Sequence, residues 1–304
     1  MKYKKNNYII SLILSLAIKF GLIKGKKYIK LFSKILIIDL NLIGISKAIY
    51  CEKYREVDHT NIFSYKLKNK RKILDLGANI GYYMLLEAAD SDQNSKIICI
   101  EPDQRNIDLL KENIKINNLD EKVTIVKAAV SGEDGSVSLN ISGASNLNKI
   151  EENNPIVNKD AILVNSTSLN SIYEKFGYFD TLRMDVEGAE SVILSKNSEI
   201  FLKSMPSNST IFMEVHPQNY IGKAKVMSDA LLNLNENGFN KFDIVTSGKK
   251  PDNKILKKLG KSEVYFKDGR FKRFHYENIS FNNLQDFVIH TPKIIRYVIA
   301  EKYE

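Results

Sequence analysis

The sequence is poor in the residues that build cross-linked, metal-rich or membrane-spanning chains. Its 304 residues include no Trp, only two Cys and only six Pro. Cys51 and Cys99 cannot form a disulfide framework or a Cys-rich zinc site, so we expect a reduced, cytoplasmic setting. The longest apolar run, residues 8–18, is about half the roughly twenty residues that a membrane span needs. These shortages exclude a disulfide-stapled scaffold and a multi-span membrane protein.

Acidic residues are scarce at the start of the chain. Residues 1–72 contain 17 Lys and Arg but only four acids, a net charge of +13, whereas the whole chain carries +9. The remaining residues therefore carry −4. The basic excess, which would otherwise suggest a polyanionic partner, belongs to the N-terminal quarter alone. A mildly acidic body disfavours a nucleic acid substrate, so we expect no nucleic acid partner.

The N-terminal quarter combines apolar residues with interspersed lysines. Its second apolar stretch, residues 28–49, contains Lys30, Lys34 and Lys47. This spacing fits amphipathic helices, so we expect residues 1–71 to form a basic, helical extension. Three roles stay open for it. It could pack on the body or on a second copy in a homodimer, contact an anionic membrane or glycan peripherally through residues 1–50, or serve as a signal anchor.

From residue 72 onward, strand-like and helix-like segments alternate. The expected strands are 72–76, 96–101, 123–126, 179–184, 209–215, 242–246 and 286–290. The expected helices are 80–89, 106–117, 189–202 and 223–237. Such alternation predicts an α/β fold, a doubly wound and mostly parallel sheet with helices on both faces. Residues 131–171 interrupt the rhythm and are predicted to form a hairpin and loop insertion within the domain 72–304.

A glycine-bearing turn follows the first of these strands. It reads Asp75-x-Gly77-x-Asn79-x-Gly81 and leads into a helix. The glycines allow backbone conformations that a side chain would forbid, and the helix start offers free N–H groups to a carboxylate. Asp75 could accept a hydrogen bond from a cationic amine. Because the pattern is not G-x-G-x-x-G, it suits a ligand with an amino acid end and no pyrophosphate.

An acid ends the next strand. Glu101, followed by Pro102, is placed to accept hydrogen bonds from both hydroxyls of a ribose. Together, the glycine turn and Glu101 resemble the first two cofactor motifs of class I S-adenosylmethionine-dependent methyltransferases. This resemblance implies a seven-stranded Rossmann-like sheet and S-adenosylmethionine as cofactor. It also implies cofactor contacts by a group of seven residues: Asp75, Gly77, Asn79, Gly81, Glu101, Pro102 and Ala129.

Two further runs narrow the resemblance. Asp185-Val-Glu187-Gly188-Ala189-Glu190 follows an apolar strand, and Phe212-Met-Glu214-Val-His216 ends another. Both runs are similar to signatures of FkbM-type methyltransferases, and so is the Ala128–Ser131 run. The resemblance covers residues 72–245. One departure is Arg183, where that family usually has Lys. The resemblance implies methyl transfer to a hydroxyl of a small molecule, a glycan or a lipid-linked acceptor.

The candidate catalytic residues lie where parallel strands end. They are Asp185, Glu187, Glu214 and His216. His216 could be the base with Glu214 orienting it, since a spacing of two on a strand puts both on one face. Asp185 could instead hold the acceptor or the cofactor amine. Asp185, Glu214 and His216 would also suit a divalent ion, but some methyltransferases need none, and we assign no metal.

Two other functions stay open at this stage. One is a non-catalytic cofactor-binding or scaffold protein docked through its N-terminal helices. The other is an RNA methyltransferase, suggested only by the overall basic charge. Tyr82 and Tyr83, next to the glycine turn, could place an aromatic face beside a sulfonium, although core packing explains them equally well.

Overall fold

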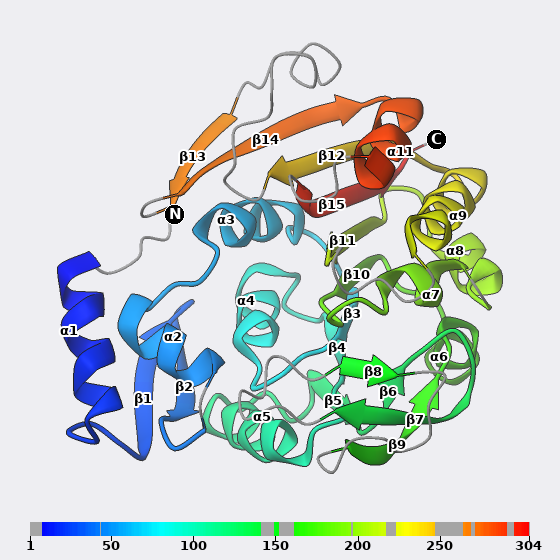
Figure 1. Cartoon of the computed structure of the whole chain (residues 1–304). Helices are drawn as coiled ribbons and strands as arrows, with labels where there is room; N and C mark the ends of the chain where they lie inside the picture. The colour runs from blue at the N-terminus through cyan, green and yellow to red at the C-terminus, as the bar shows by residue number, and fades with distance from the viewer. Residues whose placement is uncertain are drawn as a thin grey trace.

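The protein is built around a nine-stranded sheet, which this computed structural model places between two layers of helices (Figure 1). The structure describes residues 8–42, 44–140, 149–151, 161–195, 197–216, 223–246, 264–268, 271–290 and 295–303. The strand order is β13-β14-β12-β15-β11-β10-β3-β4-β5. The bounds are β3 Lys72–Leu76, β4 Lys96–Ile100, β5 Val123–Val126, β10 Thr181–Met184, β11 Thr210–Glu214, β12 Phe239–Thr246, β13 Val264–Asp268, β14 Phe271–Ile279 and β15 Ile295–Lys302.

The strand directions confirm the predicted doubly wound sheet. Strands β5, β4, β3, β10 and β11 are parallel, and β15 enters antiparallel between β11 and β12. These seven strands form the predicted seven-stranded arrangement, since they follow one another as 3-2-1-4-5-7-6 in order of appearance. The hairpin β13–β14 extends the sheet by two strands at the β12 edge. The order reverses between β3 and β10, which is where ligands bind in such sheets.

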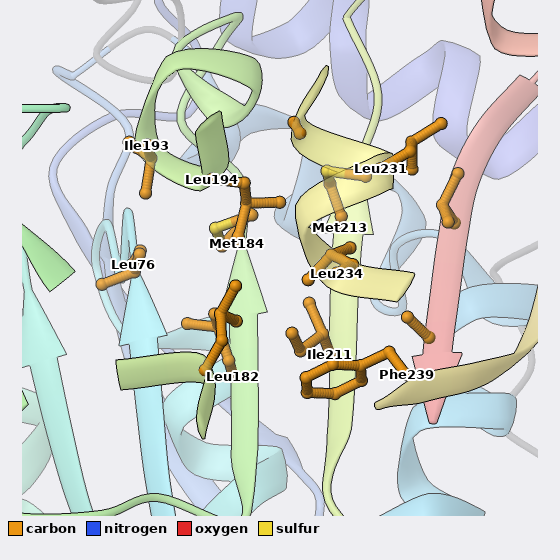
Figure 2. Close-up of a cluster of buried hydrophobic side chains, with 14 of the residues drawn as sticks. Leu76, Leu182, Met184, Ile193, Leu194, Ile211, Met213, Leu231, Leu234 and Phe239 are labelled. Atoms are coloured by element: carbon orange, nitrogen blue, oxygen red, sulfur yellow. The ribbon is translucent and has the colours of Figure 1, made fainter. Parts of the chain in front are cut away.

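Side chains of the central strands alternate between two cores. Leu74, Leu182 and Ile211 point to one core, whereas Ile73 and Phe212 point to the other. Figure 2 shows the first core, where strand residues meet Ile193, Leu194, Leu231 and Leu234 of the covering helices. Near-continuous burial on both faces is typical of parallel strands. Polar residues within these strands are therefore exceptions that require partners.

The helices divide between the two faces of the sheet (Figure 1). One face is covered by α3 Val57–Lys66, α4 Tyr82–Asp90 and α5 Gln104–Ile116. The other is covered by α6 Leu169–Phe176, α7 Glu190–Ser195, α8 Glu199–Ser204, α9 Lys223–Glu236 and α11 Phe281–His290. Two sequence predictions need correction. The helix expected over residues 189–202 is divided into α7 and α8, and the strand expected over 286–290 belongs to α11, where Leu284, Phe287 and Val288 are buried at helical spacing.

The interruption at residues 131–171 forms a small sheet of its own. Its order is β6-β9-β7-β8, with bounds β6 Ala129–Val130, β7 Gly135–Asn140, β8 Lys149–Glu151 and β9 Ala161–Thr167. The predicted pairing of two strands is confirmed by the antiparallel contact of β7 with β9. Residues 141–148 and 152–160, predicted as a loop, lie outside the described residues.

The N-terminal quarter is only partly helical, which differs from the sequence prediction. It contains α1 Tyr8–Lys19, β1 Lys26–Leu31, β2 Lys34–Asp39 and α2 Ile45–Glu52. Strands β1 and β2 form a hairpin in the stretch expected to be helical. Lysines four residues apart fit both helical and strand periodicity, and positive φ angles at Phe32 and Ser33 provide the tight turn. Within the described residues, no helix combines the length and apolar character that crossing a membrane requires.

Asn113 of α5 and Asn117, the residue that caps the end of this helix, hold the hairpin on the body. The amide of Asn113 accepts from the N–H of Ile37 at 2.6 Å and donates to its carbonyl at 3.1 Å. Asn117, one turn later, pairs with Ile35 in the same way. The Asn113 amide also donates to the carbonyl of Ile80, at 2.8 Å, within the glycine turn. The N-terminal quarter is thus tied directly to the predicted cofactor loop.

Candidate active site

The glycine turn after β3 passes close to the end of β10. Gly77 has φ +77°, and a Cβ there would lie 2.1 Å from the carbonyl oxygen of Asp185. At Gly81 (φ +90°), a Cβ would lie 2.7 Å from Leu110. Both positions therefore favour glycine for conformation, and Gly77, which faces backbone atoms, requires it for space as well. The close approach brings the turn and the acidic run after β10 to one point of the sheet edge.

Glu101, just beyond the end of β4, reaches back to the same turn. Its buried carboxylate accepts hydrogen bonds from the N–H of Asn79 at 2.9 Å and from the N–H of Asp103 at 3.0 Å. The side chain of Asn106 donates a third, at 3.1 Å. Burial raises the pKa of Glu101 to about 7, against the effect of these hydrogen bonds. The acid predicted to bind a ribose is thus fixed against the loop predicted to bind the rest of the cofactor.

Asp75 has a charged partner in the neighbouring strand. Its carboxylate is fully buried in β3, and its Oδ1 lies 2.8 Å from Nη1 of Arg183 in the neighbouring strand β10. Arg183 also lies 3.0 Å from Asp185 and stacks 3.8 Å from the ring centroid of Tyr83. Burial alone would lower the pKa of Arg183, but Asp75 and Asp185 hold it well above its ordinary value. Asp75 thus forms a buried ion pair, and its predicted contact with a cofactor amine stays a prediction.

One cavity collects most of the predicted site. Every predicted site residue lines it except Asp75 and Gly81: Gly77, Asn79, Glu101, Pro102, Ala129, Asp185, Glu187, Glu214 and His216. Tyr82 and Tyr83, considered as aromatic walls, line it too. Residues from distant parts of the sequence are therefore brought to the carboxyl edge of the sheet, on both sides of the point where the strand order reverses.

His216 lies at the centre of four carboxylates. Its Nδ1 is 2.8 Å from Glu190, and its Nε2 is 3.3 Å from Glu214, 3.6 Å from Glu187 and 3.9 Å from Asp185. Burial opposes a charge on the imidazole, but the hydrogen bonds to Glu190 and Glu214 outweigh it and raise the pKa of His216 to about 12. In this arrangement the imidazole holds its proton. A protonated imidazole cannot accept a proton, so this arrangement does not favour the role of base predicted for His216.

The carboxylates differ in their partners. Glu214 pairs with Arg296 as well as His216, and Asp185 pairs with Arg183. Burial raises the pKa of Glu214 and of Glu187 to about 7. Asp185, Glu214 and His216 each offer one ligand atom, and these atoms lie within 4.8 Å of one another. The group has the composition of a divalent-cation site, although the sequence alone favoured an enzyme without a metal.

Sequence reasoning missed three charged residues of the cavity. Arg55 and Glu56 precede α3, and Arg296 is in β15, yet all three line the cavity. Glu56 accepts hydrogen bonds from the hydroxyl of Tyr83 at 2.8 Å and from Arg296 at 3.1 Å. Weak signals existed, since Arg55 is one of only two arginines in residues 1–72 and Arg296 interrupts an apolar strand. The predicted boundary at residue 72 therefore does not separate the N-terminal part from the site.

Strand order, glycine turn and acidic edge together define the class of the protein: it has the fold of class I methyltransferases. The sequence profile described as the methyltransferase FkbM domain matches residues 75–241. The chain belongs to this family. The match covers the turn, Glu101 and the acidic cluster, and it confirms the resemblance derived from the motifs.

Solved structures give more distant similarities. A methyltransferase FkbM from Methylobacillus flagellatus KT is 14% identical, covering 68% of this chain and 44% of that one, with a TM-score of 0.41. A putative O-methyltransferase from Klebsiella pneumoniae is 9% identical over 83% and 82% of the chains, with a TM-score of 0.42. An O-methyltransferase from Bacillus cereus, in complex with SAH, is 8% identical over 98% and 92%, with a TM-score of 0.41. Comparison with curated proteins finds no match.

Proposed function

We propose that the protein transfers a methyl group from S-adenosylmethionine to a hydroxyl of a small molecule, a glycan or a lipid-linked acceptor. The observation that carries this proposal is a single shared cavity. The glycine turn and Glu101 line it together with the carboxylates around His216. A cofactor held by the first group would therefore share one cavity with the proton acceptors of the second.

The residues present fit this cofactor. Gly77 exposes bare backbone to the cavity, and the Glu101 carboxylate suits the two hydroxyls of a ribose. Gly77, Asn79, Glu101, Pro102 and Ala129 would hold the cofactor. When bound, it supplies a methyl group on a sulfonium, which is a good leaving group.

Glu187 is the carboxylate we assign as the base. Asp185 and Glu214 are paired with arginines, whereas the carboxylate of Glu187 contacts the cavity and lies 3.6 Å from His216. A positioned base typically contributes a factor of about 10²–10⁴ to the rate. Glu187 would take the proton of the acceptor hydroxyl, and the positive charge of His216 favours its ionised form, against the burial that raises the pKa of Glu187 to about 7.

The lining also constrains the acceptor. Five carboxylates line the cavity, those of Glu56, Glu101, Asp185, Glu187 and Glu214. Three arginines, Arg55, Arg183 and Arg296, also line it, but the carboxylates outnumber them, so the lining disfavours phosphate groups and the proposal includes no nucleic acid substrate. A neutral polyol, phenol or sugar hydroxyl fits better, because its hydroxyls can donate to the carboxylates.

Two measurements test the proposal. Calorimetry of the full chain with S-adenosylhomocysteine should show binding, weakened by Glu101→Ala; no binding by folded protein would overturn it. Labelled S-adenosylmethionine with a panel of hydroxyl acceptors should then yield O-methyl products. Cofactor binding without turnover on any acceptor would support a non-catalytic, cofactor-binding scaffold instead.

A variant pair separates catalysis from binding. Glu187→Gln should lower kcat by about 10²–10⁴-fold while changing the Kd of S-adenosylhomocysteine by about twofold or less. Glu199→Gln, on the exposed surface of α8, is the matched control and should leave both unchanged. An unchanged kcat in Glu187→Gln would remove this residue as the base.

A further inference from the structure

A buried carboxylate on the Nδ1 side fixes the orientation of the His216 imidazole. Glu190 is fully buried, and its Oε1 lies 2.8 Å from Nδ1 of the imidazole. A carboxylate at Nδ1 selects the tautomer that carries its proton there, which leaves Nε2 to face the other side. Histidine ligands of metals are held in this way, with a buried carboxylate on the second nitrogen. Glu190 therefore has a positioning role that the sequence did not reveal.

On the other side, Nε2 faces ligands from two adjacent strands. Glu214 ends β11, and Asp185 follows β10; the two strands pair in register at Met184 and Met213. Their carboxylate oxygens and Nε2 of His216 lie within 4.8 Å of one another. The ligand atoms thus project from the rigid edge of the sheet, and this edge lines the cavity.

The charges around this point are unbalanced. Arg183 is shared between Asp75 and Asp185, and Arg296 is shared between Glu56 and Glu214. Arg55 also pairs with Glu56, at 3.5 Å, so three arginines and His216 face six carboxylates, those of Asp75, Asp185, Glu56, Glu214, Glu187 and Glu190. Buried charges need compensation, so the cluster favours a further cation.

We propose that Asp185, Glu214 and His216 bind a divalent cation of the Mg²⁺ or Mn²⁺ class, which replaces the proton on Nε2 of His216 and releases it to solvent, and that the acceptor hydroxyl becomes a further ligand. Two carboxylates and one imidazole suit these ions. The second half of the proposal rests on the proposed methyl transfer, whereas the cation site itself does not. The acceptor would then be a compound that offers one or two adjacent hydroxyls to the ion.

Bound to the cation, the hydroxyl would lose its proton more readily. The O–H bond breaks and its proton passes to the carboxylate of Glu187. An O–C bond forms to the methyl carbon as the S–C bond breaks, and the sulfur keeps that electron pair as a neutral thioether. No oxidant or further reactant is required.

Mn²⁺ is the probe for the site. Titration of the full chain with Mn²⁺, followed by electron paramagnetic resonance of the free ion, should show one site per chain. Asp185→Asn and His216→Gln should each weaken binding at least tenfold. Glu190→Gln should weaken it by about 10–100-fold, as expected for a residue that orients a ligand. Glu277→Gln, at the exposed edge of a separate Asp243 and His275 cluster, should have no effect.

Two outcomes would overturn the site: no Mn²⁺ binding by folded protein, or wild-type affinity in His216→Gln with its fold intact by circular dichroism. Calorimetry with S-adenosylhomocysteine in the presence of a chelator keeps the two proposals apart. Cofactor binding without Mn²⁺ binding would remove the cation and leave the methyltransferase in place. Mn²⁺ binding without cofactor binding would keep the cation site and overturn the proposed methyltransferase.

A second, independent observation concerns α1 and the residues that follow it. Large apolar side chains here expose between 45% and 79% of their surface: Ile10, Leu12, Ile13, Leu16, Phe20, Leu22 and Tyr28. Helix α1 lies at the periphery of the molecule, beside α2 (Figure 1). A hydrogen bond from Ser11 to the carbonyl of Cys51, 2.8 Å long, links the two helices. We call these apolar side chains the N-terminal apolar patch.

Lysines accompany this patch. Lys19, Lys24, Lys26 and Lys30 are exposed along the same segment, and residues 1–72 carry a net charge of +13. Exposed apolar side chains beside lysines are what an interfacial helix presents to a bilayer with anionic headgroups. Helix α1 has 12 residues, about 18 Å of rise, which lets it lie in the interface and not cross it.

We infer that the N-terminal apolar patch docks on an anionic membrane surface. Vesicle flotation with the full chain should show binding to phosphatidylcholine vesicles that contain phosphatidylglycerol, and weaker binding without it. The double variant Ile13→Asp/Leu16→Asp should lose binding. Ile200→Asp, at a 53% exposed position on α8, is the matched control and should retain it.

Analytical ultracentrifugation tests the alternative that the patch joins two copies of this chain. If wild type is a dimer that the double variant converts to a monomer, and neither binds vesicles, the patch joins two copies of this chain and the membrane proposal fails. Flotation that is unchanged in the double variant would also overturn it.

Discussion

Arg183 and Asp75 form a buried ion pair across neighbouring strands, with Nη1 and Oδ1 2.8 Å apart. Their Cα atoms are direct partners in the register of β10 and β3, so both charges lie inside the sheet. The same guanidinium reaches Asp185 at 3.0 Å and stacks on Tyr83. Through Arg183, the strand that carries the glycine turn is linked to the acid at the cavity.

Removing this arginine should leave Asp75 buried and unpaired. We expect Arg183→Met to lower the free energy of unfolding by about 3–5 kcal/mol, measured by urea denaturation. Arg183→Lys keeps the charge but loses the planar fork and the stacking, so we expect a smaller loss of about 1–2 kcal/mol. The double variant Asp75→Leu/Arg183→Met should recover part of the stability. A loss equal to the sum of the single variants would contradict a coupled pair.

Gly77 should tolerate no side chain. Gly77→Ala would place Cβ 2.1 Å from the carbonyl of Asp185, so the turn or the end of β10 must move. We expect a loss of stability of at least about 3 kcal/mol and loss of S-adenosylhomocysteine binding in calorimetry. Gly25→Ala is a matched control with a similar φ (+73°) and no atom within 4 Å. It should cost only the backbone strain, about 1–2 kcal/mol. Equal losses of stability in Gly77→Ala and Gly25→Ala would show that the clash at Gly77 is relieved at little cost in free energy.

The sequence predicted the site best where local patterns place residues at strand ends. Gly77, Glu101, Asp185 and Glu214 follow or end short apolar strands, and parallel strands bring their carboxyl ends to one edge. Because these residues are at strand ends in the sequence, their location at the edge of the sheet could be predicted. The same logic did not reveal the ion pair of Asp75, because its partner Arg183 is distant in sequence and only strand register brings them together.

The features that the sequence did not predict depend on long-range contacts and on turn geometry. Arg296 reaches the cavity because β15 enters between β11 and β12, which no local pattern indicates. The N-terminal hairpin was expected as a helix because its lysines repeat at a spacing of four, which is compatible with both periodicities. Burial against α5 decided between them, and that contact spans about eighty residues.

Asn113 should stabilise this hairpin more than Asn117. Asn113→Ala would leave the N–H of Ile37 and the carbonyl of Ile80 without their partner in a buried place. Buried groups left unsatisfied cost about 1–3 kcal/mol each, so we expect a loss of about 2–4 kcal/mol in urea denaturation. Proteolysis within residues 20–40 should also become faster. At Asn117, water can replace the side chain, so Asn117→Ala should lower the free energy of unfolding by about 1 kcal/mol or less. A larger loss than in Asn113→Ala would contradict this ranking.

Glu101 should make cofactor binding depend on pH. Burial raises the pKa of this carboxyl to about 7, above the value of about 4.3 expected in an unfolded chain. The folded state thus binds more protons than the unfolded state between these two values, so this group lowers stability as the pH rises from about 4.3 to 7. Binding follows the opposite sign, because the ionised carboxylate accepts hydrogen bonds from ribose hydroxyls.

Calorimetry with S-adenosylhomocysteine should therefore show an affinity about tenfold higher at pH 8 than at pH 6, since the ionised fraction of a group with a pKa of about 7 rises about tenfold. Glu101→Gln should bind more weakly at pH 8 and lose this share of the pH dependence. Asp108→Asn, exposed on α5, should keep the wild-type profile. Other carboxyls at the cavity also titrate near neutrality, so the difference between wild type and Glu101→Gln is the quantity that reports on this residue. A pH dependence that Glu101→Gln retains in full would assign the titration to the cluster around His216, and the buried carboxylate would then bind the cofactor in one protonation state throughout.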